Sequence, residues 1–336
     1  MIVTLTPSDT EKDPYILDKV LRTVRSRGDI IQLEDGVTAL TRGNWAFPEF
    51  GWISLASGVS LRGGAVKLAP DATRETNGKV RPAKDLNILW CGEECEIKGT
   101  TFDCTAPTGW NGGGLRFHGR FTVEDCDITG LSGTLDVQES FAISAQGKTA
   151  GTVVKRVKVY DCYTADPKSY VSGVYIGATD GGGGNTVQDC DVDLGPNGWF
   201  CYSSTKHTIF LGCTGISKRF WYTDTDDGEA LLTHCRGTVH YAAVSSVVVK
   251  DSPIRRVMAQ DCEFNGSGSA RAAEWWNKGA EVTGNLVFRS CQFTDFAYSA
   301  AIVAKQGSVV FVDCEFPSEE TPKESLGDGS FEPIFL

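Results

Sequence analysis

The sequence predicts an all-β solenoid, a parallel β-helix, and two features of its cysteines carry this prediction. Nine of the twelve cysteines recur at intervals of 22–36 residues among strand and turn residues. Self-similarity at a spacing of about 20–50 residues is typical of solenoids, and irregular intervals suit a parallel β-helix because its turns accept insertions. The recurring positions are Cys104, Cys126, Cys162, Cys190, Cys213, Cys235, Cys262, Cys291 and Cys314.

The second feature is the residue before each recurring cysteine, which is aspartate in six of the nine copies. Alternating apolar residues precede it, as at Val123 and Phe288, and predict a strand with one buried face. Because these residues lie three positions before their cysteines, a one-residue bend must intervene, and aspartate tolerates such bends. We expect the cysteines to be free, buried and stacked, since neighbouring strands lie about 4.8 Å apart, farther than the Cβ atoms of a relaxed disulfide.

Both ends of the chain carry segments suited to covering a solenoid. Residues 13–27 have apolar side chains at helical spacing, with Asp13 as N-cap, Pro14 as the first helical residue and Gly28 as the stop. This helix would cover the first coil. Residues 317–336 are rich in glutamate, glycine and proline, so we expect them to leave the repeat and cover the last coil. Residues 1–336 would then form a single β-helix domain.

The charge balance excludes some classes of partner. The chain has 32 lysines and arginines against 43 aspartates and glutamates, a net charge of -11, with no block of basic residues. Binding to nucleic acid or to an anionic membrane is therefore not expected. No run of 18 apolar residues exists to span a membrane, and the N-terminus lacks the features of a signal peptide.

Two motifs near the N-terminus extend the pattern. Residues 28–36 read Gly-Asp-Ile-Ile-Gln-Leu-Glu-Asp-Gly, and residues 58–63 read Gly-Val-Ser-Leu-Arg-Gly. With the helix before them and the cysteine-centred coils after them, they resemble the pectin-lyase-like right-handed β-helix superfamily. The resemblance implies a right-handed parallel β-helix. It also implies that the protein belongs to one of the classes found in this superfamily, which are polysaccharide lyases, glycoside hydrolases, epimerases, and phage or surface adhesins. It also favours an extracellular or periplasmic location, which the missing signal peptide leaves open.

The signatures of particular enzymes in this superfamily do not match. The polygalacturonase-like hydrolases carry an Asp-Asp pair, then Gly-His-Gly, then Arg-x-Lys. This chain has Asp226-Asp227 but no Gly-His-Gly, and its Arg156-Val157-Lys158 precedes the pair instead of following it. The resemblance therefore implies an architecture and a class of ligand, not a specific enzyme.

The strand upstream of each cysteine would line one long face, and in this superfamily that face commonly holds the substrate groove. Stacked coils also make a continuous surface that suits an extended polymer, whatever the family. Aromatic and polar residues are dense on this face, although strand alternation turns one residue of each adjacent aromatic pair inward. The substrate-binding candidates are Tyr175, Tyr202, Trp221, Glu274, Trp275 and Trp276.

An acidic turn and two basic residues are the candidates for catalysis. Asp224, Asp226 and Asp227 follow a strand, and two carboxylates about 5–10 Å apart can serve as acid and base in glycoside hydrolysis. For β-elimination from a uronate, His240 would be the base, and Lys278 would neutralise the carboxylate. Asp224, Asp226 and Glu229 would also suit calcium, and a solvated turn explains the same cluster.

The sequence thus predicts a protein that binds a polysaccharide along a groove and cleaves it, by hydrolysis or by elimination. The alternative is a non-catalytic rod, either a surface adhesin or a phage-like fibre module, since no catalytic signature matches. A monomer and a trimer are both compatible with the sequence.

Overall fold

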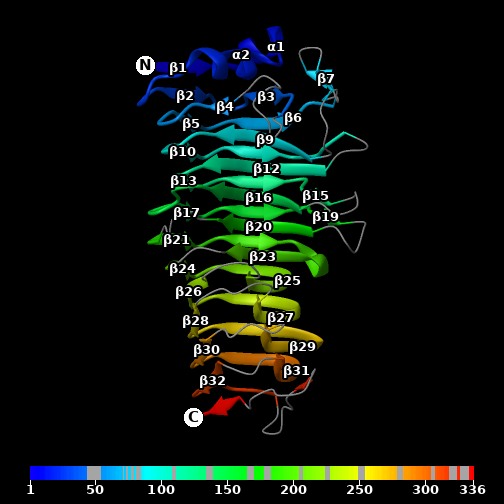
Figure 1. Ribbon diagram of the computed structural model, residues 1–336. Helices are drawn as coiled ribbons and strands as arrows, with labels where there is room; N and C mark the ends of the chain where they lie inside the picture. The colour runs from blue at the N-terminus through cyan, green and yellow to red at the C-terminus, as the bar shows by residue number, and fades with distance from the viewer. Residues whose placement is uncertain are drawn as a thin grey trace.

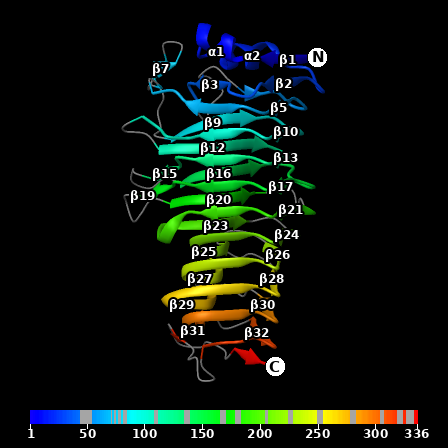
Figure 2. The ribbon, with the colours of Figure 1, turned by 180° about the vertical axis from the view of Figure 1, so that it is seen from behind.

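The computed structural model shows a chain that winds from its N-terminus at one end of an elongated stack to its C-terminus at the other (Figures 1 and 2). The residues that the structure describes are 1–43, 54–70, 72, 75–76, 79–80, 85–107, 111–133, 139–164, 170–177, 183–203, 207–223, 228–248, 254–277, 283–303, 307–317, 324–325 and 333–336.

Three faces of parallel strands make up the wall of the stack. The first face is a sheet of 13 strands in the described part of the chain. Its strands are β1 (Ile2–Leu5), β2 (Ile30–Leu33), β5 (Ser60–Arg62), β10 (Cys95–Lys98), β13 (Phe121–Glu124), β17 (Val153–Lys155), β21 (Asn185–Gln188), β24 (Thr208–Leu211), β26 (Gly228–Thr233), β28 (Ile254–Gln260), β30 (Thr283–Arg289), β32 (Ser308–Val312) and β34 (Ile334–Phe335).

The second and third faces belong to one larger sheet. The second face begins with β3 (Thr38–Thr41), β6 (Ala65–Leu68), β11 (Thr101–Asp103), β14 (Asp127–Thr129), β18 (Lys158–Tyr160) and β22 (Asp191–Asp193). The third face begins with β4 (Ser54–Leu55), β9 (Asp85–Cys91), β12 (Asn111–His118), β16 (Glu139–Gln146), β20 (Tyr170–Ile176) and β23 (Gly198–Ser203).

From the middle of the stack onward, one long strand runs through both of these faces. The first part of β25 (Thr214–Thr223) pairs with β22, and its second part pairs with β23. The strands β27 (Arg236–Val248), β29 (Glu263–Asn277) and β31 (Gln292–Val303) follow it in the same way, and β33 (Glu324–Ser325) pairs with β31. Short elements outside the faces are β7 (Glu75–Thr76), β8 (Lys79–Val80), β15 (Ser132–Gly133), β19 (Tyr163–Thr164) and the 3-10 helix Gly195–Asn197.

This arrangement confirms the predicted parallel β-helix. Of the paired strands that the structure describes, only β7 and β8 run antiparallel. The first face has more strands than the nine recurring cysteines indicate, because the coils near the N-terminus turn at glycine instead, as at Gly63 and Gly99 with φ of +73° and +65°. Neither of the described helices is long and apolar enough to cross a membrane.

Two short helices lie at the N-terminal end, α1 (Pro7–Lys12) and α2 (Ile16–Thr23). The predicted helix over residues 13–27 was wrong at both ends, and α1 was missed. Asp13 does not cap α2, because its Oδ1 accepts a hydrogen bond of 3.1 Å from the Tyr15 amide before the helix begins. The apolar spacing was read correctly, since Leu17 and Leu21 of α2 are fully buried.

The C-terminal tail continues the stack where the structure describes it. Ile334 and Phe335 of β34 pair with Val310 and Phe311 of β32, so these residues add a strand to the first face. The expectation that residues 317–336 leave the repeat does not hold for this strand. Most of the tail lies outside the described residues.

The predicted one-residue bend is confirmed at eight of the nine cysteines. The preceding residue has a left-handed backbone with φ between 49° and 62° in each case, and most residues reach this region only at a cost. The bend residues are Asp125, Asp161, Asp189, Gly212, His234, Asp261, Ser290 and Asp313.

Cys104 and Cys162 lie at a different corner of their coils, although Asp161 before Cys162 is also left-handed, with φ of 54°. The pairing of Thr101 with Asp127 places Thr100 level with Cys126, and the pairing of Lys158 with Asp127 places Val157 there in the next coil. Cys104 and Cys162 therefore come after the second-face strands β11 and β18, one strand later than predicted.

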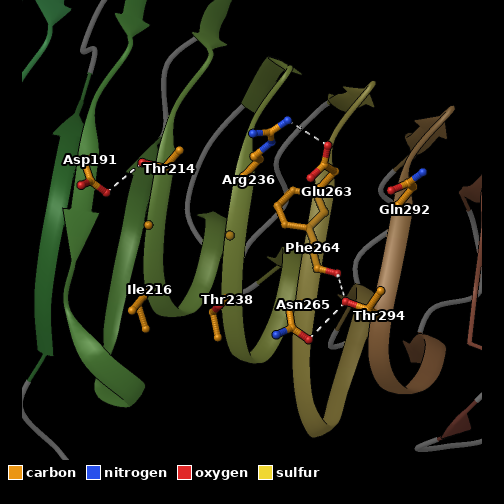
Figure 3. Close-up of a pocket in the computed structure, with 12 residues that line it drawn as sticks. Asp191, Thr214, Ile216, Arg236, Thr238, Glu263, Phe264, Asn265, Gln292 and Thr294 are labelled. Atoms are coloured by element: carbon orange, nitrogen blue, oxygen red, sulfur yellow. Dashed lines mark hydrogen bonds and ion pairs between the residues drawn. The ribbon is translucent and has the colours of Figure 1, made fainter.

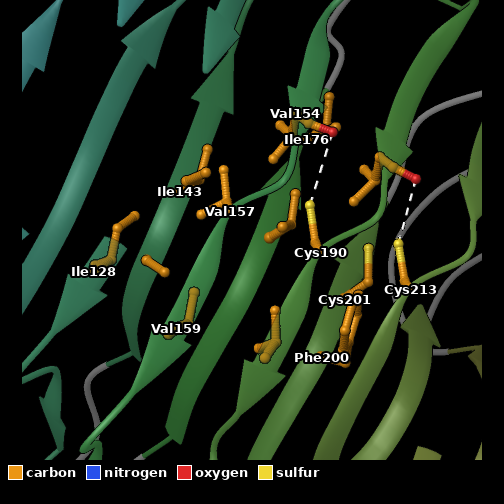
Figure 4. Close-up of a cluster of buried hydrophobic side chains, with 14 of the residues drawn as sticks. Ile128, Ile143, Val154, Val157, Val159, Ile176, Cys190, Phe200, Cys201 and Cys213 are labelled. Carbon is orange, nitrogen blue, oxygen red and sulfur yellow. Dashed lines mark hydrogen bonds between the residues drawn. The ribbon is translucent and has the colours of Figure 1, made fainter. Parts of the chain in front are cut away.

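The thiols at the bends lie in the interior and contact the backbone of the coil before. All twelve cysteines are free. The Sγ of Cys213 lies 3.4 Å from the Val187 carbonyl oxygen, and that of Cys291 lies 3.3 Å from the Ala259 carbonyl oxygen. Figure 4 shows Cys190 and Cys213 directed at such carbonyls among buried aliphatic side chains. A thiol is a weak donor that also packs as a small apolar group, so it suits a corner where a carbonyl meets an apolar interior.

We predict that Ser290→Val lowers the free energy of unfolding by about 1–2 kcal/mol, because a β-branched residue resists the left-handed conformation at this bend. Ser290→Gly should stay within about 0.5 kcal/mol of the wild type. Thr122→Val, at an extended position of β13, is the matched control and should change little. Urea unfolding of the three variants measures this, and equal stabilities for the valine and glycine variants at position 290 would contradict it.

We also predict that native protein exposes few reactive thiols. Ten of the twelve cysteines are buried, and Cys162 and Cys314 are partly exposed. Burial raises the pKa of Cys162 to about 12, which leaves little of the reactive thiolate at neutral pH. An aromatic disulfide reagent should modify Cys162 and Cys314 slowly in native protein, and all twelve thiols in denaturant. Rapid native modification of Cys213, or fewer than twelve thiols after unfolding, would count against the fold.

Candidate functional site

Five aromatic side chains gather on the outward side of the third face. We call Tyr170, Tyr175, Trp199, Tyr202 and Tyr222 the aromatic platform; they come from the consecutive strands β20, β23 and β25. Ring centroids lie 4.4 Å apart for Tyr170 and Trp199, 4.7 Å for Trp199 and Tyr222, and 5.3 Å for Tyr175 and Tyr202. The platform is a cluster separate from the interior core. Trp199 and Tyr202 both belong to it although Phe200 and Cys201 between them lie in the core, so the regular alternation of β23 is interrupted there.

The members of the platform differ in exposure. Trp199, Tyr202 and Tyr222 are each less than a tenth exposed, whereas Tyr170 and Tyr175 are half-buried. The parallel register places Tyr175, Tyr202 and Tyr222 level with one another in successive coils. Tyr170 and Tyr175 therefore form the accessible margin of the platform.

A buried carboxylate continues the same column of side chains. Ser245 and then Glu274 follow Tyr222 in register. Glu274 is 2% exposed, and its Oε2 accepts hydrogen bonds from Ser245 Oγ at 2.6 Å and from Arg219 Nε at 3.1 Å. Its Oε1 accepts one from the Tyr241 hydroxyl at 3.1 Å. Both oxygens are thus satisfied, as a buried charge requires.

Three cationic side chains surround the Tyr241 ring. The guanidinium carbons of Arg219 and Arg271 lie 4.1 Å and 4.2 Å from its centroid, and the ammonium of Lys218 lies 6.0 Å from it. Arg271 Nη1 also donates to the Tyr241 hydroxyl at 2.9 Å. We call Lys218, Arg219, Tyr241, Arg271 and Glu274 the charge cluster.

The charge cluster alters the protonation of two of its members. Burial, and then the negative charge of Glu274, raises the pKa of the Tyr241 hydroxyl, so this group stays neutral and can donate to the carboxylate. Burial, and then the positive charge of Arg219, lowers the pKa of the Lys218 ammonium.

Irregular strand pairing makes the cluster possible. Between Ser217 and Arg219 there is one residue, Lys218, whereas the paired strand has two between Val239 and Ala242. The extra residue alters the alternation at the corner of the second and third faces. Ala242 lies in register between Arg219 and Arg271, and the ring of its neighbour Tyr241 contacts both guanidinium groups.

Of the predicted substrate-binding residues, the structure brings together Tyr175, Tyr202 and Glu274. Trp276 is half-buried, and it pairs in register with Val247, which packs against the platform.

Trp221 and Trp275 lie elsewhere: they are 1% and 0% exposed and belong to the interior core. Their assignment to a surface is corrected, because their neighbours Tyr222 and Glu274 point outward and alternation turns the two tryptophans inward.

The predicted catalytic residues are mostly outside the part of the chain that the structure describes. This holds for Asp224, Asp226, Asp227 and Lys278. His240 is half-buried in β27, and its imidazole makes no hydrogen bond to a described residue.

Glu229, proposed with Asp224 and Asp226 for calcium, lies on the first face, away from Glu274. His207 Nδ1 lies 2.8 Å from its Oε2, and Arg256 Nη1 lies 3.9 Å from its Oε1. Within the described ranges, no group of three or more His, Cys, Asp or Glu side chains could hold a metal ion.

Seven members of the two clusters were absent from the predicted binding set: Tyr170, Trp199, Lys218, Arg219, Tyr222, Tyr241 and Arg271. Only the register brings them together, since they come from five strands. One local signal existed for Arg271, which stands three residues before Glu274. The pairing shifts between Ala270 and Arg271, and this irregularity accompanies the outward position of Arg271.

A hollow of about 370 Å³ lies on the second face over β22 to β31 (Figure 3). Its polar side chains pair with one another across neighbouring coils: Asp191 with Thr214 at 2.8 Å, Arg236 with Glu263 at 3.1 Å, and Asn265 with Thr294 at 3.2 Å. These pairs link successive strands and leave few free groups for a ligand. The third face, with its aromatic platform and charge cluster, is the stronger candidate.

The comparisons with known proteins bear on the fold. No protein-family model matches the sequence, and no curated protein is detectably similar to it. Among solved structures, a mutant tailspike protein of Escherichia coli bacteriophage HK620 in complex with a pentasaccharide has a TM-score of 0.57 and 13% identity. The match covers 99% of this chain and 62% of that chain, so this chain spans less than two thirds of the tailspike.

Two further solved structures are similar at lower scores. The same tailspike with a hexasaccharide has a TM-score of 0.49 and 13% identity, and the match covers 91% of this chain and 61% of that chain. The catalytic domain of a GH87 alpha-1,3-glucanase with tetrasaccharides has a TM-score of 0.42 and 7% identity, covering 95% and 65%. The chain is thus a parallel β-solenoid whose architecture is consistent with the pectin-lyase-like β-helix.

We predict that Glu274→Gln lowers the free energy of unfolding by about 3 kcal/mol, because it leaves the largely buried Arg219 guanidinium without a countercharge. The control is Glu263→Gln, which removes an exposed ion pair with Arg236 and should cost less than about 1 kcal/mol. Urea unfolding followed by tryptophan fluorescence measures both. Equal effects of the two substitutions would contradict the role given to Glu274.

Proposed function

We propose that the chain binds a polysaccharide or oligosaccharide along the third face, over the aromatic platform. The observation that carries the proposal is the set of five aromatic side chains that three successive coils hold together on the outside of the wall. Sugar rings present flat C–H patches that pack on aromatic faces, while an outward aromatic cluster on a soluble protein commonly marks a binding site.

The charge cluster supports the same ligand class. Sites for small polar ligands combine apolar surface with a few fixed polar groups that set orientation. Here Arg219 contacts both parts: it lies 5.2 Å from the Tyr222 ring of the platform and pairs with Glu274. A sugar ring on the platform would place its hydroxyls toward the Lys218 and Arg219 side of the site.

The architecture also supports binding of an extended glycan. Parallel strands repeat the surface at about 4.8 Å per coil, which suits a polymer lying along the stack. The tailspike with a TM-score of 0.57 was solved in complex with a pentasaccharide, which makes a saccharide a reasonable ligand for this chain as well.

Cleavage is a separate part of the proposal and depends on other residues. Glycoside hydrolysis needs two carboxyl groups about 5–10 Å apart. In the described part of the site, Glu274 is the carboxylate, and both of its oxygens are engaged. A second carboxylate would have to come from Asp224, Asp226 or Asp227, with His240 and Lys278 remaining candidates for an elimination.

We predict that Tyr175→Ala weakens glycan binding about tenfold, because it removes an accessible ring from the margin of the platform. Tyr163→Ala is the matched control; Tyr163 is 60% exposed in β19, outside the platform, and its loss should leave binding unchanged. Binding is measured on a glycan array and then by calorimetry with the strongest ligand. Equal losses in both variants, or no glycan bound at all, would refute the proposal.

The same mixtures report on cleavage. New reducing ends indicate hydrolysis, and absorbance from unsaturated products indicates elimination. Binding without either product, in the wild type and in Asp226→Ala alike, would leave a glycan-binding protein without catalytic activity on the polymers tested.

A further inference from the structure

The terminal nitrogens of Arg219 are free to bind a ligand. The hydrogen bonds that Arg219 makes with Ser245 and Glu274 both use Nε. Its Nη1 and Nη2 donate to no described residue, and neither atom is among the buried polar atoms that lack a hydrogen-bond partner. A guanidinium whose Nε is fixed by a buried carboxylate is held in one orientation, so its two free NH₂ groups form a pre-oriented pair of donors.

Lys218 offers a second free cation next to them. Its ammonium makes no ion pair with a described residue, and it lies 6.0 Å from the centroid of the Tyr241 ring. Arg219 lies against the same ring at 4.1 Å and is close enough to lower the pKa of the Lys218 ammonium. Such proximity of like charges is unfavourable unless an anion joins them.

The charges of the cluster also favour an anionic ligand. Lys218 and Arg219 give two positive charges, and Glu274, which pairs with Arg219, gives one negative charge, so this part of the cluster carries an excess of positive charge. This excess is notable in a chain whose net charge is -11. Around such a half-buried site, the effective dielectric constant is below that of water, which strengthens attraction for an anion.

We propose that Lys218 and Arg219 form a subsite for the carboxylate of an acidic sugar, so that the ligand of the third face is an acidic glycan. A carboxylate matches the paired NH₂ groups of a guanidinium in geometry, and Lys218 adds a point charge beside it. The platform, through Tyr222, would hold the ring of the same sugar or of its neighbour. This inference rests on the proposed function, because it names the class of glycan that the platform binds.

The test compares acidic glycans with their neutral counterparts. Wild-type protein is measured by calorimetry against oligosaccharides of galacturonic acid and of sialic acid, against the carboxyl-reduced form of each, and against neutral dextran oligosaccharides. We expect an acidic member to bind at least about tenfold more tightly than its carboxyl-reduced form, and this preference to shrink as salt is added.

Variants of Lys218 test whether this side chain binds the carboxylate of the sugar. Lys218→Met keeps the length of the side chain and removes its charge, so it should reduce acidic-glycan affinity about tenfold and lower neutral-glycan affinity by a much smaller factor. Lys218→Arg should retain most of the binding. Lys158→Met, at an exposed position of β18 on the second face, is the matched control and should change nothing.

The outcomes separate this inference from the proposed function. If neutral or carboxyl-reduced glycans bind as well as acidic ones, or if Lys218→Met and Lys158→Met behave alike, the acidic subsite is refuted and glycan binding stands. If no member of the panel binds, both are refuted. An acidic preference that Lys218→Met abolishes supports both.

Discussion

The structure depends on a single backbone constraint, the left-handed residue at the corner between the first and second faces. That residue turns the strand by one position and returns the next side chain to the interior. Because a bend interrupts the alternation, it leaves a carbonyl of the neighbouring coil at the corner, and a cysteine thiol packs against it in coil after coil. The thiol suits the position because it is small, apolar and a weak donor at once.

Regular bends have a consequence on the far side of each coil. When every coil turns at the same place, corresponding residues of successive coils lie side by side along the stack. The outward side chains of the third face therefore form columns. The column from Tyr175 through Tyr202 and Tyr222 to Ser245 and Glu274 is such a product. Aromatic packing along one part of it and a satisfied buried carboxylate along the other give the site two chemically different halves, joined by Arg219.

Much of the fold could be predicted from the sequence because its signal is local. The residue before each cysteine and the alternation upstream of it are both visible within eight residues, and they predicted the bends at Asp125 through Asp313. The same local signal misplaced Cys104 and Cys162, since an Asp-Cys pair also occurs at the ends of the second-face strands β11 and β18.

The site was harder to predict, because Trp199, Arg219 and Arg271 come together only through register. An irregular pairing near Lys218 and Tyr241 alters the alternation there, which no periodic reading of the chain reveals.

The central claim is that the bend cysteines lie in one line inside the stack, level from coil to coil. Sulfur anomalous diffraction from crystals of the protein tests it most directly. The account predicts separate peaks for Cys190, Cys213, Cys235, Cys262, Cys291 and Cys314, spaced about 4.8 Å apart along the axis. Peaks joined at the roughly 2 Å separation of a disulfide, or scattered without a common line, would contradict it.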